Sequence, residues 1–85
     1  MYKLLYHPRT AKQIKKLGPQ EKTRVADKIK KLVEGPFSGR LDIKKLTNAR
    51  ASFRLRIGNV RVIFEINEEK ELIFIMDIDY RGQIY

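Results

Sequence analysis

Apolar and polar side chains alternate from Phe53 to Ile66, and the alternation is interrupted at Gly58-Asn59. A period of two places successive side chains on opposite faces of a β-strand. A two-residue Gly-Asn break between two such segments is typical of a β-hairpin turn. The segment therefore predicts two antiparallel strands with one apolar face, and a second layer of structure must cover that face.

The two-residue turn also determines which side chains lie opposite one another. It pairs Ile57 with Val60, and Arg56 with Arg61. Arg54, Arg56 and Arg61 then leave the sheet on the side opposite the core, which we call the arginine face. Like charges placed directly opposite each other destabilise a hairpin. An anion or a nearby carboxylate must therefore compensate for these arginines.

The N-terminal half predicts one strand and two helices. Residues 1–6 have the pattern of a short strand. Apolar positions recur at helical spacing from Thr10 until Gly18-Pro19, which ends one helix and starts another. Gly35-Pro36 stops the second helix, whose apolar stripe includes Val25 and later positions on the same face. Two helices joined by so tight a break predict a helical hairpin.

The remaining segments complete one small α+β domain over residues 1–85. We interpret residues 37–52 as a loop that contains a short extended piece at 41–46. A turn at 67–70 precedes the last strand, Leu72–Ile78. The predicted order is β-α-α-β-β-β: an N-terminal strand, a helical hairpin and an antiparallel three-strand meander, with the helices packed on one sheet face.

The last strand is apolar on both faces, so its phase is set by the side chains that suit the core. We place Phe74, Met76 and Ile78 on the core face. This phase adds three charged side chains to the arginine face: Asp77, Asp79 and Arg81. The two aspartates pairing with the arginines would make a surface ion-pair network without function. The planar fork of arginine also suits phosphate recognition, so the second interpretation is an anion-binding face.

The charge of the chain is high and uneven. It contains 19 Lys and Arg against 10 Asp and Glu, a formal net charge of +9. Residues 1–61 hold 17 of the basic and 4 of the acidic side chains, whereas residues 62–85 are net acidic. A basic surface of this density favours a polyanionic partner, either nucleic acid or an acidic protein segment. The alternative is a solvated, lysine-rich surface.

Several kinds of chemistry are excluded by composition. The chain has no cysteine and one histidine, His7, so it has no thiolate nucleophile, no Cys-based zinc site and no paired-histidine base. We expect no metal and no cofactor. The longest apolar run, Leu72 to Met76, is far shorter than the roughly 20 residues of a membrane span, and no secretory signal is evident. We expect a soluble cytoplasmic domain that does not bind a membrane.

Three segments resemble a known family. The run FRLRIGNVRVIFE at residues 53–65 resembles the core signature of the RelE/ParE toxin superfamily. The ending DYRGQIY at 79–85, with an arginine four residues before a tyrosine, resembles the C-terminal motif of that superfamily. The segment LDIKKL at 41–46 matches its usual lead-in. With the two-helix N-terminal half, the resemblance covers essentially the whole chain.

The resemblance implies a toxin of a type II toxin–antitoxin system, and in RelE-like members a ribosome-dependent endoribonuclease that cleaves mRNA. A ribose 2′-hydroxyl attacks the adjacent phosphate, and basic side chains stabilise the added negative charge. The catalytic positions carried over are Arg54, Arg56, Arg61, Arg81 and Tyr85. We assign three further residues to RNA binding: Lys44, Lys45 and Tyr80. The implied partners are the ribosome with its mRNA and a cognate acidic, RelB-like antitoxin.

The general base stays open at this point. Several family members have lysine where this chain has Arg54 and Arg56, or histidine where it has Tyr80. Arginine effectively does not lose its proton, so it is no base. Tyr85, Glu65 and the ribosomal RNA are the remaining candidates. Two alternatives therefore stand beside the nuclease: a ParE-like inhibitor of DNA gyrase that cuts no RNA, and a degenerate member that only binds an antitoxin.

Overall fold

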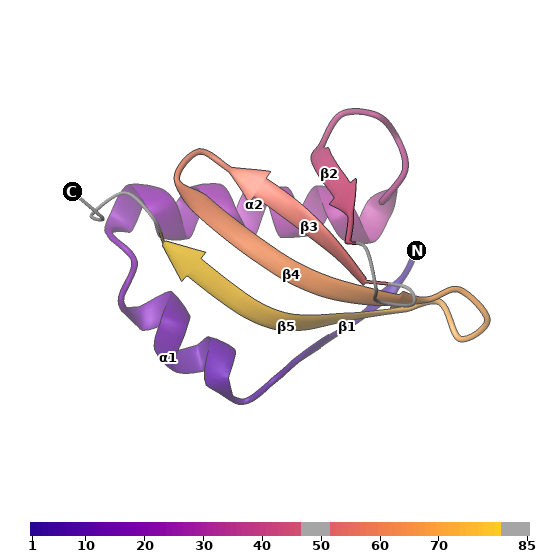
Figure 1. Ribbon diagram of the computed structural model, residues 1–85, viewed down its shortest axis with the longest axis horizontal. Coiled ribbons are helices and arrows are strands. Elements are labelled where there is room, and N and C mark those ends of the chain that lie inside the picture. The colour runs from indigo at the N-terminus through magenta and orange to yellow at the C-terminus, as the bar shows by residue number, and fades with distance from the viewer. Residues whose placement is uncertain (47–51, 81–85) are drawn as a thin grey trace.

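The computed structural model describes residues 1–46 and 52–80 and contains two helices and five strands in that part of the chain (Figure 1). The predicted α+β class is confirmed, and the order of the predicted elements holds, but the antiparallel part has four strands where we predicted a meander of three. The 41–46 piece is a full strand of the sheet. The elements are β1 (Lys3–Tyr6), α1 (Arg9–Lys15), α2 (Pro19–Glu34), β2 (Asp42–Lys45), β3 (Ser52–Ile57), β4 (Val60–Asn67) and β5 (Leu72–Tyr80).

The helices begin beside Pro8 and at Pro19, and α2 ends before Gly35, as predicted; α1 ends at Lys15, short of the predicted break at Gly18-Pro19. Pro8 occupies the position before α1, and the Thr10 hydroxyl donates a 2.7 Å hydrogen bond to the carbonyl of His7. Pro19 is the first residue of α2, where its missing N–H has no helical partner to lose. Gly35 follows the last residue of α2. None of the helices in the described ranges is long and apolar enough to cross a membrane.

The strands form one mixed sheet in the order β1-β5-β4-β3-β2. The β2–β3–β4–β5 part is antiparallel throughout, and β1 pairs with β5 in parallel. β2 is an edge strand in which Ile43 lies opposite Leu55 and extends the apolar face by one strand. The position of β1 beside β5 depends on long-range pairing that no local pattern in residues 1–6 encodes.

The register of the β3–β4 hairpin is the predicted one. Ile57 lies opposite Val60, and Arg56 lies opposite Arg61. Gly58 has a φ of +58°, whereas Asn59 has no positive φ, and this combination is the pattern of a type II′ turn. Glycine tolerates this conformation because it has no Cβ.

The predicted phase of β5 is wrong for its first half. Ile73 and Ile75 are fully buried, whereas Phe74 and Met76, which we expected in the core, are only partly buried. The sheet register explains why Ile78 is nevertheless buried as predicted. A β-bulge interrupts the pairing with β4 and leaves Met76 without an opposite residue. One extra residue reverses which face the following side chains occupy.

The bulge determines where the acidic residues of β5 lie. Beyond it, Asp77 lies opposite Ile63 and Asp79 lies opposite Arg61. Both aspartates are therefore on the arginine face, as predicted, although the predicted phase that led to this placement was wrong. Without the bulge the same strand would direct Asp77 and Asp79 toward the core.

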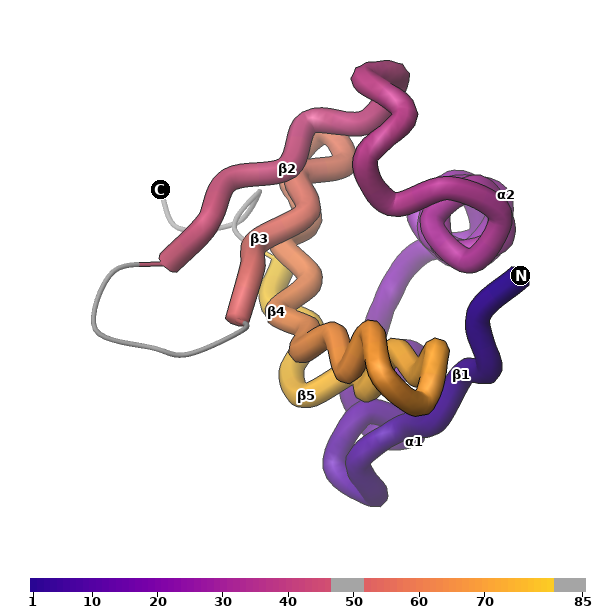
Figure 2. Tube along the Cα trace, turned by 90° about the vertical axis from the view of Figure 1, so that its right-hand side faces the viewer, coloured from indigo at the N-terminus to yellow at the C-terminus, as the bar shows by residue number. Residues whose placement is uncertain are grey.

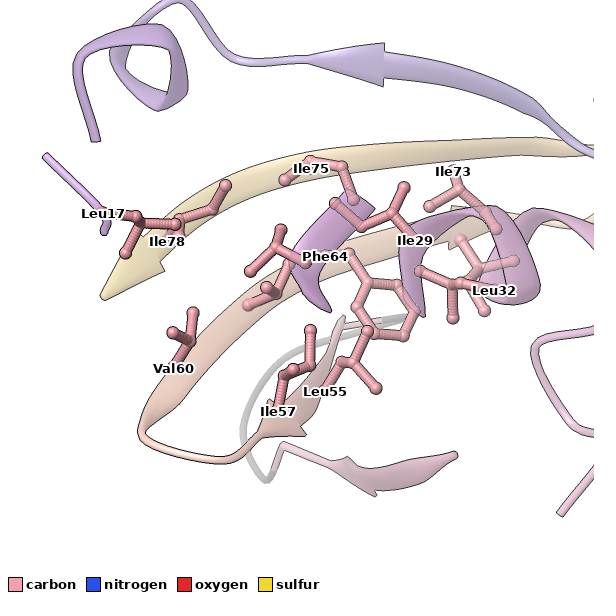
Figure 3. Close-up of a cluster of buried hydrophobic side chains, with 13 residues drawn as sticks. Leu17, Ile29, Leu32, Leu55, Ile57, Val60, Phe64, Ile73, Ile75 and Ile78 are labelled. Carbon is pink, nitrogen blue, oxygen red and sulfur yellow. The ribbon is translucent and has the colours of Figure 1, made fainter. Parts of the chain in front are cut away.

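The core lies between the sheet and α2. Val25, Ile29 and Leu32 form the buried stripe of α2. Figure 2 shows α2 on one side of the sheet, and the core residues place it over the face opposite the arginines. In the close-up of the core the ring of Phe64 lies among Ile29, Leu32 and Leu55 (Figure 3). The apolar stripe of α2 and the apolar face of the sheet thus pack together into a single core layer.

The helix α1 completes the edge of β5 where β1 ends. The side-chain amide of Gln13 donates to Asp77 Oδ1 at 2.6 Å, and its oxygen accepts the backbone N–H of Ile78 at 2.8 Å. The backbone N–H of His7 donates to the carbonyl of Ile75 at 2.8 Å. Gln13 thereby supplies contacts that a continuing strand would otherwise make, and it satisfies a backbone donor at the sheet edge.

The central place of Phe64 gives a stability prediction. Phe64→Ala removes a fully buried ring that also stacks on Phe53 at 5.6 Å between ring centroids. We expect the free energy of unfolding to fall by about 3–5 kcal/mol in urea titrations followed by circular dichroism. Phe37→Ala is the matched control, because Phe37 is 59% exposed and should cost about 1 kcal/mol or less. Equal losses in the two variants would contradict this assignment of the core.

Candidate functional site

The arginine face carries a row of four charged residues that crosses four strands. In this row Asp42, Arg56, Arg61 and Asp79 lie opposite one another in turn, so that two arginines are flanked by two carboxylates. Arg61 Nη2 donates to Asp79 Oδ2 at 3.0 Å. The pair is partly exposed, so its contribution to stability is modest. Its clearer effect is to offset the charge of one of the two facing arginines.

The neighbouring row on the same face is less compensated. It consists of Lys44, Arg54, Ile63 and Asp77, again opposite one another across the four strands. Asp77 is already hydrogen-bonded to Gln13 of α1. Ile63 stands between Asp77 and the two cations. Lys44 and Arg54 are therefore adjacent positive groups, and neither has an acidic residue next to it in the row.

Charge pairing over the described residues confirms this imbalance. The ion pairs within 4.0 Å there are Lys31–Asp27 on α2 and Arg61–Asp79. Lys44, Arg54 and Arg56 thus make no ion pair with the described part of the chain. The Nε atoms of Arg54 and Arg61 are buried and have no hydrogen-bond partner within residues 1–46 and 52–80. Unsatisfied buried donors and unpaired cations are both costly, and a bound anion reduces the cost of the cations.

The chemistry available on this face is electrostatic. Arginine offers several N–H donors in a planar fork and a permanent positive charge, which suit a phosphate that gains negative charge during a reaction. Glu65, at the far end of β4 on the same face, lies opposite Ser52 and Phe74. It is two residues along β4 from the row of Arg54. No group of three or more His, Cys, Asp or Glu that could hold a metal occurs in the described residues.

The structure separates two of the predicted RNA-binding residues from the arginine face. Lys45 lies opposite Phe53, whose ring stacks on the core residue Phe64, so its position belongs to the other face. Tyr80 lies opposite Val60 and packs against the core. Lys44, by contrast, lies beside Arg54. Arg81 and Tyr85 lie outside the described residues.

Two residues of the site are not among the sequence predictions. Asp42 ends the first row, and Gln13 holds Asp77 away from the arginines. The role of Asp42 follows from the pairing of β2 with β3, and sequence offers no signal for that register. Gln13 has a weak signal, since it lies beside the apolar position Ile14 in a helix whose other polar residues are mostly basic.

Comparisons with known proteins show the family to which the chain belongs. Residues 4–85 match the family described as "ParE toxin of type II toxin-antitoxin system, parDE", and the chain belongs to the RelE/ParE superfamily of toxins of type II toxin–antitoxin systems. No curated protein matches the sequence significantly.

Solved structures of RelE proteins share the fold. RelE in the archaeal RelE–RelB complex from Pyrococcus horikoshii OT3 is 25% identical, with a TM-score of 0.83 over 96% of this chain and 97% of that one. The isolated Escherichia coli RelE toxin is 20% identical, with a TM-score of 0.79 over 100% and 92%. The Mycobacterium tuberculosis RelBE2 complex gives 22% identity and a TM-score of 0.79 over 94% and 98%.

The Arg61–Asp79 pair gives a test of anion binding at this face. Asp79→Asn leaves Arg61 beside Arg56 without its carboxylate. We expect the free energy of unfolding to fall by about 1 kcal/mol or less. We also expect inorganic phosphate to raise the Tm more in this variant than in the wild type, because a bound anion replaces the lost charge. Thermal unfolding over a series of phosphate concentrations measures both.

The matched control for this experiment is Asp27→Asn, which breaks the Lys31–Asp27 pair on α2. That pair lies on a helix on the other side of the sheet, so the phosphate response of this variant should equal that of the wild type. Equal responses in the Asp79→Asn and Asp27→Asn variants would show that phosphate does not act at the arginine face.

Proposed function

We propose that this toxin is a ribosome-dependent endoribonuclease that inhibits translation by cleaving mRNA. The observation that carries the proposal is the adjacent set of cations on the arginine face, Lys44, Arg54 and Arg56, which have no ion-pair partner in the described residues. The phosphates of an RNA backbone carry negative charge that can pair with these cations, which lie on the neighbouring strands β2 and β3. The fold shared with RelE toxins supports the same function.

The proposed reaction is an internal transfer at phosphorus. The 2′-oxygen of a ribose forms a bond to the adjacent phosphorus, and the bond from phosphorus to the 5′-oxygen of the next nucleotide breaks. The products are a 2′,3′-cyclic phosphate and a 5′-hydroxyl, and the proton lost by the 2′-hydroxyl is balanced by the one gained at the leaving oxygen. Arg54, Arg56 and Arg61 stabilise the extra negative charge of the five-coordinate intermediate.

Proton transfer requires a group other than these arginines, because arginine keeps its proton. Glu65 lies on the arginine face but two positions along β4 from the row of Arg54. Tyr85 and the ribosomal RNA are the other candidates for the base. Arg81 and Tyr85, from the C-terminal sequence motif, complete the proposed catalytic set. Of the proposed RNA-binding residues, Lys44 is the one that lies beside Arg54.

We further propose that an acidic antitoxin neutralises the toxin by covering the arginine face. The P. horikoshii and M. tuberculosis relatives were solved as toxin–antitoxin complexes. An acidic segment offers carboxylates to Lys44, Arg54 and Arg56 and competes directly with RNA phosphates. Binding of the antitoxin and of RNA should therefore be mutually exclusive.

One observation favours a second function. The family that matches residues 4–85 is described as ParE toxins. The resemblance to that branch implies an inhibitor of DNA gyrase that does not cut RNA. In that case the arginine face is a protein- or DNA-binding surface. The lack of an identified base among the residues of the face is compatible with this alternative.

A cell-free translation reaction separates the two functions. The wild-type protein is added, the 5′ ends of the mRNA are mapped, and gyrase supercoiling is assayed in parallel. We expect cuts in phase with codons, and a loss of about a hundredfold in cleavage rate with Arg54→Gln, as for removal of one oxyanion donor. Arg9→Gln is the control, because Arg9 is an exposed arginine of α1 and does not belong to the strands of the arginine face.

Intact mRNA together with inhibited supercoiling would overturn the nuclease proposal and support the gyrase inhibitor. Intact mRNA with normal supercoiling would overturn both and leave a member that only binds an antitoxin. Equal cleavage by the Arg54→Gln variant and the wild type would exclude the arginine face as the cleavage site.

A further inference from the structure

A second basic site lies at the end of the sheet, between α2, β2 and the β3–β4 turn. It is a cavity of about 370 Å³, within the size range of small-ligand pockets. Four basic residues line it, and one carboxylate joins them. The residues that bear on its chemistry are Arg24 and Lys28 of α2, Arg40, Asp42, Arg56 and Gly58.

The charges of this cavity are poorly compensated. Arg24, Lys28, Arg40 and Arg56 bring four positive charges against the single negative charge of Asp42. None of the five takes part in an ion pair within 4.0 Å among the described residues. Converging like charges repel each other unless an anion lies between them. The cavity is therefore suited to a group that carries at least two negative charges.

The backbone brings these side chains together in a defined way. Arg24 and Lys28 are one helical turn apart, so they project from the same side of α2, beside its buried stripe. The guanidinium of Arg24 lies against the turn: a Cβ built on Gly58 would be 3.5 Å from Arg24 Nη1. Gly58 thus serves the turn through its positive φ and also leaves its backbone open to close approach by a ligand or side chain.

We propose that this cavity binds a backbone phosphate of the RNA, at a second anion site next to the one on the arginine face. Arg56 belongs to both, because it lines the cavity and stands in the row with Arg61. A single-stranded RNA bound at Arg54 and Arg56 therefore meets the next basic residues in the cavity, at the end of β3. This inference rests on the proposed function, since it takes RNA as the anion. The cavity would raise the affinity for RNA and fix the position of the strand, and it would take no part in bond cleavage.

Inorganic phosphate is the first probe. In ¹⁵N-labelled full-length protein we expect phosphate to shift the amide signals of Leu41 and Gly58, which line the cavity. The Arg24→Gln/Lys28→Gln variant should lose these shifts. The matched control is Lys22→Gln/Lys30→Gln, which removes the same charge from exposed positions of the same helix and should keep them. Unchanged Leu41 and Gly58 signals in the wild type, or equal shifts in both variants, would overturn the inference.

A single-stranded RNA decanucleotide is the second probe, without ribosomes and by fluorescence anisotropy at several salt concentrations. Losing one phosphate contact should lower the slope of log affinity against log salt by about 0.7 in the Arg24→Gln/Lys28→Gln variant. The control variant should change the slope much less. An oligoglutamate of equal length tests whether the cavity instead binds an acidic protein segment. Tighter cavity-dependent binding of oligoglutamate than of RNA would overturn the assignment to RNA.

The failure of this inference is distinguishable from failure of the nuclease proposal. If the wild type cleaves mRNA and the Arg24→Gln/Lys28→Gln variant binds and cleaves it equally well, the cavity inference is wrong and the nuclease remains. If RNA binding depends on the cavity but no mRNA is cut, the cavity is a phosphate site and the nuclease proposal is wrong.

Discussion

The placement of Arg56 directly opposite Arg61 is the constraint on which the rest of the arginine face depends. The two-residue turn at Gly58-Asn59 imposes this pairing, because any other loop length would shift the register of β3 against β4. Two facing guanidinium groups repel each other, and the sheet offsets the repulsion with carboxylates on the flanking strands β2 and β5. The offset is incomplete: of the two facing arginines, Arg61 makes an ion pair within the described residues and Arg56 does not. The remaining positive charge makes the face suited to binding an anion.

The β-bulge at Met76 links this face to the core. Before the bulge, Ile73 and Ile75 fill the core, and after it Ile78 does so, while Asp79 turns toward Arg61. One unpaired residue therefore lets the strand bury its isoleucines on both sides of the bulge and still place Asp79 on the arginine face, which strict alternation does not allow. Gln13 stabilises the same region from α1 and holds Asp77 at the sheet edge. The fold thus sets how many carboxylates reach the arginines, and within residues 1–46 and 52–80 it leaves Lys44 and Arg54 without one.

Local patterns predict the helices, the β3–β4 hairpin and the common face of its three arginines, because periodicity and turn chemistry act over a few residues. They do not predict the parallel pairing of β1 with β5 or the strand character of β2, which depend on contacts between distant segments. The phase of β5 is mispredicted for Phe74 and Met76, since an apolar strand has no alternation to reveal a bulge. The same limit applies to the site: Asp42 and the cavity beside α2 arise only once β2 is in place.

The side-chain Nε–H groups of Arg54 and Arg61 give the most direct test that the arginine face binds phosphate. Both Nε atoms are buried and lack a hydrogen-bond partner within the described residues. Their ¹H–¹⁵N signals can be followed by NMR while inorganic phosphate is added at constant ionic strength. The account predicts saturable shifts of both signals, larger than that of the exposed Arg9. Signals of Arg54 and Arg61 that stay unchanged at saturating phosphate would contradict it.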